Sequence, residues 1–241
     1  MIMLAGTGFA MKLVAHFLPA TCGLERRRVP WLLLSPTSQV RLRPITHLHM
    51  VLCRHALLFG ALLISFYAYE QTFCSAGSRS IIQSYCAAPV LLLVSETLLA
   101  TVNLLWLSTG QVLPSIHNRP WLARSVADFW GHRWNLWFSD WFRFAIFSRL
   151  RHRPVFAIVL AFVVSGVIHE WVINFPLYLV TGKTLYGTMM LYFLLQAIGV
   201  LVERRFKHYP VLLRAFAWLV VLIPAPLILN EGLLRAMHLW R

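Results

Sequence analysis

Long apolar runs separated by short basic segments dominate the pattern of residues along this chain. A helix that crosses the hydrocarbon of a bilayer needs about 20 mostly apolar residues. Five runs reach or approach this length, and the first of them is the shortest. The pattern therefore predicts an all-α fold, a polytopic bundle of transmembrane helices, with runs at 56–70, 87–110, 155–180, 184–202 and 211–231.

The Lys and Arg residues concentrate in alternate connecting segments. Of the 22 in the chain, six lie in 23–55, seven in 111–154 and four in 203–214. The segments 71–86 and 181–183 carry one each. Because Lys and Arg are enriched in cytoplasmic loops, we expect the three basic segments to face the cytoplasm.

The composition supports a membrane protein. The 241 residues are 59% hydrophobic and only 12% charged, and the mean hydropathy is +0.68, more apolar side chain than a soluble domain of this size can bury. The net charge is +14. Because the basic residues lie between apolar runs, they indicate a role in membrane topology and contact with anionic headgroups rather than binding of nucleic acid. The first 20 residues lack the features of a cleavable signal peptide.

We divide the chain into two parts. Residues 1–55 are an N-terminal interfacial or membrane segment followed by a basic cytoplasmic segment. Residues 56–241 are the transmembrane domain, and the motifs described below lie within 120–205.

Two ionisable residues stand side by side in the third apolar run, in the sequence VVSGVIHEWVI of residues 163–173. Ionisable groups at membrane depth are costly and commonly functional, so His169 and Glu170 indicate a site. The alternative is a neutral His169 hydrogen-bonded to a neighbouring helix, with Glu170 snorkelling or paired to an arginine. For Glu170 we expect a packing or ion-pair role. Ser165 and Gly166, one turn earlier, either let a helix approach closely or leave room for a ligand. A zinc site is not indicated, because no histidine follows at i+4.

Other polar residues lie within or at the ends of apolar runs, namely Glu96, Gln196 and Glu203. Such residues fit an internal polar cavity, and they fit hydrogen bonds between helices equally well.

The stretch SVADFWGHRWNLWFSDWFRF, residues 125–144, is unusually aromatic. On a helix, four tryptophans would form one stripe: Trp130, Trp134, Trp137 and Trp141. The opposite side would be polar, with Asp128, His132, Asn135 and Arg143. The pattern predicts an interfacial amphipathic helix with its tryptophans toward lipid. A helix that only anchors the chain fits the same pattern.

Three segments together resemble the wax synthase branch of the membrane-bound O-acyltransferases. They are SVADFWGHRWN at 125–135, FVVSGVIHEW at 162–171 and LYFLLQAIGVLVE at 191–203. The branch carries a DFWGRRWN-like segment, an SGxxHE segment in a membrane helix and an FFLLQ…E segment after it. His132 departs from this pattern, because the family more often has Arg or Lys there.

The resemblance implies transfer of an acyl group from acyl-CoA to the hydroxyl of a lipophilic alcohol within the membrane, with acyl-CoA as co-substrate and no metal or other cofactor. The catalytic histidine of the family maps onto His169, and its polar partner maps onto Asn135. Imidazole suits a general base, because its neutral form accepts a proton near neutral pH. Asn135 offers an amide donor to an oxyanion or carbonyl without adding charge. We expect the substrate-binding side chains to be Asp128, Trp130, Arg133, Trp134 and Ser165.

Arginines of the segment 111–154 are candidates for the CoA phosphates, in particular Arg133, Arg143, Arg149, Arg151 and Arg153. The predicted partners are acyl-CoA, the alcohol and membrane lipids, with no nucleic acid. The predicted location is multi-pass in a bacterial inner membrane or the endoplasmic reticulum membrane. Two alternatives remain open: a transporter or channel lined by the intramembrane polar residues, and a catalytically inactive, shortened paralogue.

Overall fold

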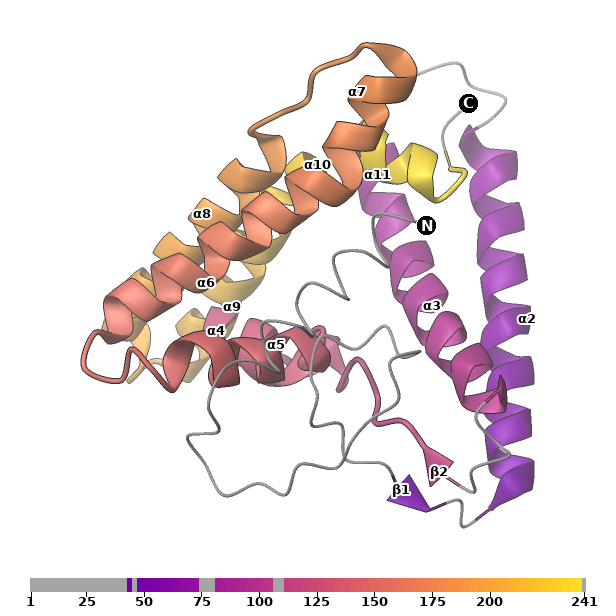
Figure 1. Ribbon diagram of the computed structural model, residues 1–241, viewed down its shortest axis with the longest axis horizontal. Coiled ribbons are helices and arrows are strands. Elements are labelled where there is room, and N and C mark those ends of the chain that lie inside the picture. Colours follow the sequence, from indigo (N-terminus) through magenta and orange to yellow (C-terminus); the bar gives the residue numbers. More distant parts are fainter. Residues whose placement is uncertain (1–42, 45–46, 74–80, 106–110, 240–241) are drawn as a thin grey trace. The chain divides into compact units, whose positions relative to one another are not determined.

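The computed structural model describes residues 43–44, 47–73, 81–105 and 111–239. These residues fall into two compact units (Figure 1). The first unit comprises His117–Ile228. The second unit comprises the described residues between 43 and 116 together with 229–239. The expected boundary at 55/56 falls inside a helix, and residues 1–42 of the expected N-terminal segment lie outside the described residues.

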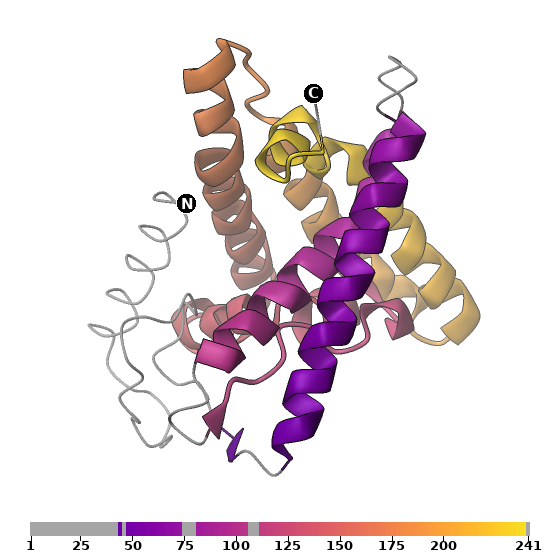
Figure 2. The same cartoon turned by 90° about the vertical axis from the view of Figure 1, so that its right-hand side faces the viewer.

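The second unit is built on two long helices that run in opposite directions (Figures 1 and 2). They are α2, Leu48–Phe73, and α3, Ile81–Leu105. The short antiparallel strands β1, Arg43–Pro44, and β2, Gln111–Val112, pair next to the start of α2 and the end of α3.

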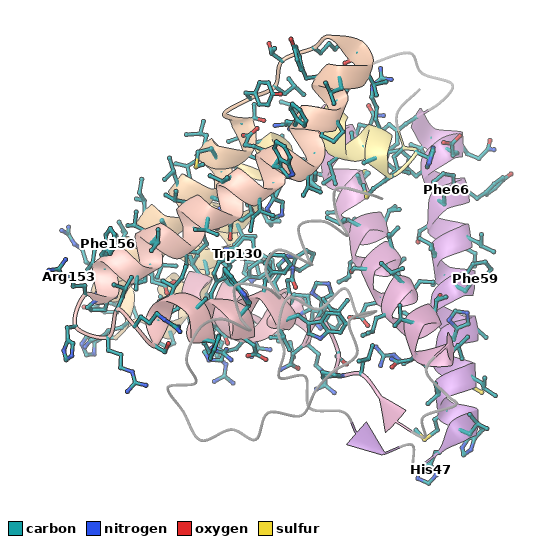
Figure 3. All side chains as sticks on the ribbon, in the orientation of Figure 1. His47, Phe59, Phe66, Trp130, Arg153 and Phe156 are labelled. Atoms are coloured by element: carbon teal, nitrogen blue, oxygen red, sulfur yellow. The ribbon has the colours of Figure 1, made fainter. Side chains whose placement is uncertain are left out.

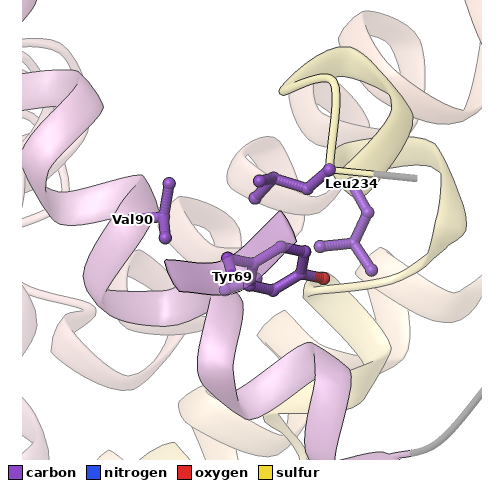
Figure 4. Close-up of a cluster of buried hydrophobic side chains, with 5 residues drawn as sticks. Tyr69, Val90 and Leu234 are labelled. Carbon is purple, nitrogen blue, oxygen red and sulfur yellow. The ribbon is translucent and has the colours of Figure 1, made fainter. Parts of the chain in front are cut away.

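The core of this unit includes a contribution from the C-terminal helix α11, Glu231–Ala236, and the residues after it. Figure 4 shows Tyr69 of α2 and Val90 of α3 against Leu234 of α11. Arg54 of α2 reaches Glu96 of α3 with a nitrogen–oxygen distance of 2.6 Å. Glu96 is therefore used in a contact between helices.

The first unit carries the motifs identified in the sequence. Its elements are Pro120–Leu122 (3-10), α4 Val126–Asp128, Phe129–Arg133 (π), α5 Leu136–Phe142, Arg143–Phe147 (π), α6 Pro154–His169, Glu170–Asn174 (π), α7 Phe175–Thr181, α8 Thr188–Val202, Glu203–Phe206 (3-10), α9 Pro210–Leu222 and α10 Ala225–Ile228. Helices α6, α8 and α9 pack side by side. Residues 126–147, which contain α4 and α5, form a crosswise segment at one end of these helices (Figures 1 and 2).

The prediction of an all-α membrane protein is confirmed. Four helical segments among the described residues are long and apolar enough to cross a bilayer: Leu48–Phe73, Ile81–Leu104, Pro154–Thr181 and Pro210–Ile228. The first is longer than the sequence predicted, because the helix continues through Arg54 and His55. The fourth predicted run contains α8, which has only 15 residues and is shorter than the about 20 of an ordinary span.

Glycines allow α8 to approach both of its neighbours. A Cβ atom on Gly166 of α6 would lie 3.1 Å from the Cα atom of Met190 in α8. A Cβ atom on Gly199 of α8 would lie 2.5 Å from Cγ1 of Val220 in α9. Of the two expectations for Gly166, the close approach of a helix is the one observed.

The prediction of one continuous helix across 125–144 is wrong. The helix stops at Trp134, and Asn135 takes a left-handed backbone conformation with φ 44° before α5 begins. The cause is local, because asparagine tolerates this conformation and caps helix N-termini. The break also ends the single tryptophan stripe.

The expected lipid-facing role of the tryptophans is wrong for three of them. Trp141 is buried, and it packs against Val164 and Ile168 of α6. Trp130 and Trp134 pack around Phe129. These tryptophans hold the crosswise segment against the protein.

Candidate active site

His169 is the last residue of α6, and its imidazole contacts a backbone carbonyl and an aromatic ring. Its Nδ1 atom lies 2.8 Å from the carbonyl oxygen of Ser165, one turn earlier. Its ring centroid lies 4.6 Å from that of Phe193 in α8. A carbonyl can only accept a hydrogen bond, so a neutral ring in this contact carries its proton on Nδ1 and leaves Nε2 as an acceptor.

Ser165, expected to bind substrate, contributes this carbonyl to the site. Its side chain is buried among the helices. A role for its hydroxyl in substrate binding remains a prediction.

Glu170 follows His169. Its carboxylate binds the start of α8 and not the side chain of an arginine. Its Oε1 accepts hydrogen bonds from the backbone N–H groups of Gly187, Met189 and Met190, at 2.9, 3.0 and 3.0 Å. Its Oε2 accepts one from Nδ2 of Asn174 at 2.7 Å. The expected ion pair or simple packing role is thus replaced by capping of the α8 N-terminus.

The crosswise segment is attached to the end of α8 by a second carboxylate. Glu203 accepts hydrogen bonds from the backbone N–H groups of Val126 and Ala127, at 2.5 and 3.0 Å. Ser125 caps α4 by accepting from the N–H of Asp128. Burial raises the pKa of the Glu203 carboxyl, although the hydrogen bonds to Ala127 and Val126 oppose this.

Asp128 and Arg133 form an ion pair inside this segment, with a nitrogen–oxygen distance of 2.6 Å. Partial burial raises the pKa of Asp128, but hydrogen bonds from Arg133 and the Arg124 backbone, with the charges of Arg133 and His132, hold it below its usual value. Arg133 also reaches the carbonyl oxygen of Asn118 at 3.5 Å. These two expected substrate-binding residues therefore bind each other.

Trp130 connects the crosswise segment to the helix that contacts His169. Its indole N–H donates to Oε1 of Gln196 at 3.1 Å, and Nε2 of Gln196 donates to the carbonyl oxygen of Val220. Trp130 is labelled in Figure 3. Its ring centroid lies 5.6 Å from that of Phe193. Gln196 and Glu203 thus both form hydrogen bonds between elements, which is the second of the two readings expected for them.

Asn135 lies in the turn between α4 and α5, beside a buried histidine. Its backbone N–H donates to Nδ1 of His117 at 3.1 Å, and its Oδ1 accepts from the N–H of Phe138 at 3.5 Å. The His117 ring packs against Trp134 in a tilted arrangement, with the ring centroids 4.3 Å apart. Burial lowers the pKa of His117 to about 4, so the ring is neutral near pH 7 and can accept this hydrogen bond.

The structure connects most of the expected site residues, but only indirectly. A continuous series of ring contacts runs from His169 to Phe193, Trp130, Phe129 and Trp134. Asn135 follows Trp134 in the chain and is not a hydrogen-bond partner of His169 among the described residues.

The arginines expected to bind CoA divide into two groups. Arg133, Arg143 and Arg149 contact protein groups, respectively Asp128, Asp140 with the Gly131 carbonyl, and the Phe144 carbonyl. Arg151 and Arg153 are exposed before α6. Within the described ranges, no cluster of three or more His, Cys, Asp or Glu side chains suits a metal ion.

Sequence reasoning missed His117 and Phe193. His117 stands apart from every motif and becomes relevant only through the fold. Phe193 lies in the LYFLLQ segment, and it falls one turn before Gln196. Helical periodicity places these two residues on one face of α8, which was the available signal.

The apolar helices and the polar groups joining them define a helical membrane protein with an imidazole held inside its helix bundle. Residues 113–198 match the family model described as the membrane bound O-acyl transferase family. The segment that contains His169, Asn135 and Trp130 is therefore similar to this family.

Two named relatives show the same similarity. A probable long-chain-alcohol O-fatty-acyltransferase 6 of Arabidopsis thaliana is 35% identical over 121 residues, which are 47% of this chain and 34% of the relative. A long-chain-alcohol O-fatty-acyltransferase of Simmondsia chinensis is 37% identical over 84 residues, or 31% and 24% of the two chains. The matches span about a third of the first relative and about a quarter of the second. No solved structure matches the chain.

Proposed function

We propose that the chain acts as an acyltransferase in the membrane, moving a fatty acyl group from acyl-CoA to the hydroxyl of a lipophilic alcohol. The single observation that carries this proposal is the contact between Nδ1 of His169 and the Ser165 carbonyl. That contact leaves Nε2 able to accept a proton. The match of residues 113–198 to an acyltransferase family model supports the same reaction.

In the proposed reaction, Nε2 of His169 removes the proton of the alcohol as its oxygen attacks the thioester carbonyl carbon. The carbon–sulfur bond then breaks, and the CoA sulfur leaves with the proton carried by His169. An ester and free CoA result. No other reactant is required.

Asn135 serves in this proposal as a neutral donor toward the thioester oxygen. Its Oδ1 is used by the turn, at Phe138, which directs the amide nitrogen away from that bond. A neutral amide donor stabilises developing negative charge without the cost of burying a cation.

The two substrates reach the site by different routes in this proposal. The CoA portion is polar and remains at the basic end of the unit, near Arg151 and Arg153. The alcohol enters from the lipid. The membrane is a bacterial inner membrane or the endoplasmic reticulum membrane, as the sequence suggested.

The direct test is lipid analysis of a host that lacks its own wax ester synthesis. The host expresses this chain and grows with or without added hexadecanol. We expect a wax ester that depends on both the chain and the alcohol. Export or uptake of the alcohol with no ester in any fraction would favour a transporter, and correct membrane insertion with no ester from any alcohol offered would favour an inactive paralogue.

A further inference from the structure

Glu170 occupies an unusual position for a carboxylate next to a proposed base. It lies in the π-helical segment Glu170–Asn174 that directly follows α6. Both of its oxygens are used: Oε1 by three backbone N–H groups and Oε2 by Asn174. All of these partners belong to the same unit of the chain.

The three N–H groups belong to the start of α8, where a helix has no internal acceptors for them. Gly187 begins this helix with φ 91°, a conformation that glycine adopts readily. A negative charge here also interacts favourably with the helix dipole. Glu170 therefore stabilises the start of α8 and joins it to the end of α6.

Asn174 completes the same connection one turn later. It is fully buried, and its Nδ2 lies 3.0 Å from the carbonyl oxygen of Leu185 and 3.4 Å from Oγ1 of Thr188. The loop between α7 and α8 is thus bound at several points to the residues that follow His169.

This connection determines which part of α8 faces the imidazole. Phe193 lies one turn after Met189 and Met190, the residues that Glu170 holds, and its ring packs against His169. A shift of α8 along α6 would move Phe193 away from the ring. The spacing between Glu170 and the α8 N-terminus therefore sets the surroundings of His169.

We propose that Glu170 is a positioning residue, which fixes the His169 imidazole against Phe193 by capping α8. The inference rests on the proposed function, because His169 is the proposed base. Glu170 itself takes no proton from the substrate and forms no bond to it.

The first measurement is independent of catalysis. Hydrogen–deuterium exchange of the full chain in detergent micelles is followed in peptides covering 186–193, for the wild type, Glu170→Ala and Glu170→Gln. We expect the amides of Gly187, Met189 and Met190 to exchange about tenfold faster in Glu170→Ala. We expect a smaller change in Glu170→Gln, whose carbonyl oxygen still accepts. Unchanged exchange in Glu170→Ala would overturn the proposal whatever the activity.

The second measurement reports the imidazole directly. The rate at which diethyl pyrocarbonate modifies His169 is followed by mass spectrometry. The rate should rise in Glu170→Ala, because the ring is no longer held against Phe193, and an unchanged rate would also overturn the proposal. Glu231→Gln is the matched control, since Glu231 stands in the first turn of α11 and is bound by Arg235. It should change neither measurement.

The functional measurement separates positioning from simple loss of folded protein. We expect kcat for ester formation to fall between about 10- and 100-fold in Glu170→Ala, with KM for acyl-CoA unchanged and partial rescue in Glu170→Gln. A kcat equal to that of the wild type would overturn the positioning role. If the wild type forms no ester, the proposed function fails, and the exchange and modification rates still decide whether Glu170 positions His169.

Discussion

At the scale of single residues, hydrogen bonds from the backbone determine what the candidate side chains can do. The carbonyl of Ser165 selects the tautomer of His169, and the N–H of Asn135 requires a neutral Nδ1 on His117. The chemistry that we propose depends on these partners as much as on the residues themselves.

His117 should make the stability of the protein depend on pH. Its pKa is lowered to about 4 in the folded chain by burial, whereas an unfolded histidine titrates near about 6.5. Between these values the unfolded state binds more protons, so stability decreases as the pH falls through this window. We expect a loss of about 2 kcal/mol from this residue between pH 7 and pH 5.

The measurement is the free energy of unfolding in micelles at both pH values. His117→Asn keeps an acceptor near the Asn135 N–H but does not titrate, so its stability should change less over this range. His152→Asn alters an exposed histidine and should behave as the wild type does. Equal pH dependence in the wild type and His117→Asn would refute the assignment.

At the scale of elements, two carboxylates and two glycines decide how the first unit is assembled. Glu170 caps α8 at its start, and Glu203 holds α4 at its end. Gly166 and Gly199 give α8 its close contacts with α6 and α9. These four positions explain why a helix of only 15 residues has a fixed place.

Gly166→Ala should destabilise the pair of α6 and α8. The new Cβ atom would lie 3.1 Å from the Met190 Cα atom, and backbone atoms cannot move aside at low cost. We expect a loss of about 1–3 kcal/mol in the free energy of unfolding, as for other overpacked sites.

The matched control is Gly60→Ala in α2, where nothing lies within 4 Å of the added Cβ atom. Alanine is the better helix former, so this variant should gain about 0.5–1 kcal/mol. The two substitutions are chemically identical and should have opposite signs. Similar effects would show that the close contact does not restrict α8.

Glu203→Gln should loosen the attachment of α4. A glutamine has one acceptor oxygen in place of two, so the N–H of Val126 or of Ala127 loses its partner. A buried donor without a partner costs about 1–3 kcal/mol. Denaturant titration followed by tryptophan fluorescence measures this loss, with Glu231→Gln as the control.

The apolar runs predicted the helices well, because a membrane helix is determined by the hydropathy of its own residues. They did not predict the break at Asn135, since that break depends on a single residue in a left-handed conformation and on its contact with His117. The predicted tryptophan stripe wrongly placed three tryptophans toward lipid, because the stripe assumed a helix without this break. His169 and Asn135 were chosen as candidates from motifs, whereas the contacts of Glu170 and Phe193 become visible only in the packing of α6 on α8.

At the scale of the whole chain, the distribution of charge agrees with the arrangement of the first unit. The basic residues 149–153 and 204–207 lie before α6 and after α8, at the end where Glu203 holds α4. The loop between α7 and α8 lies at the opposite end and contains a single cation, Lys183. The rule for cytoplasmic Lys and Arg therefore predicts which end faces inward.

Cysteine labelling tests this orientation. The four native cysteines are replaced by serine, and the variants Arg151→Cys and Lys183→Cys are treated with a membrane-impermeant maleimide. The segment Pro154–Thr181 between them has 28 residues, enough to cross a bilayer. With the chain expressed in a bacterial inner membrane, we expect label on the Lys183→Cys variant in sealed right-side-out vesicles, and on the Arg151→Cys variant only after permeabilisation. The reverse pattern would contradict the orientation.

The central claim is that His169 is the base of an acyl transfer, and turnover by the purified chain tests it most directly. The chain is reconstituted in liposomes with labelled palmitoyl-CoA and hexadecanol, and ester is quantified for the wild type, His169→Ala and His152→Ala. We expect ester from the wild type and from His152→Ala, and a rate lower by about 10²–10⁴-fold in His169→Ala. Folded His169→Ala protein that makes ester at the wild-type rate would contradict the account.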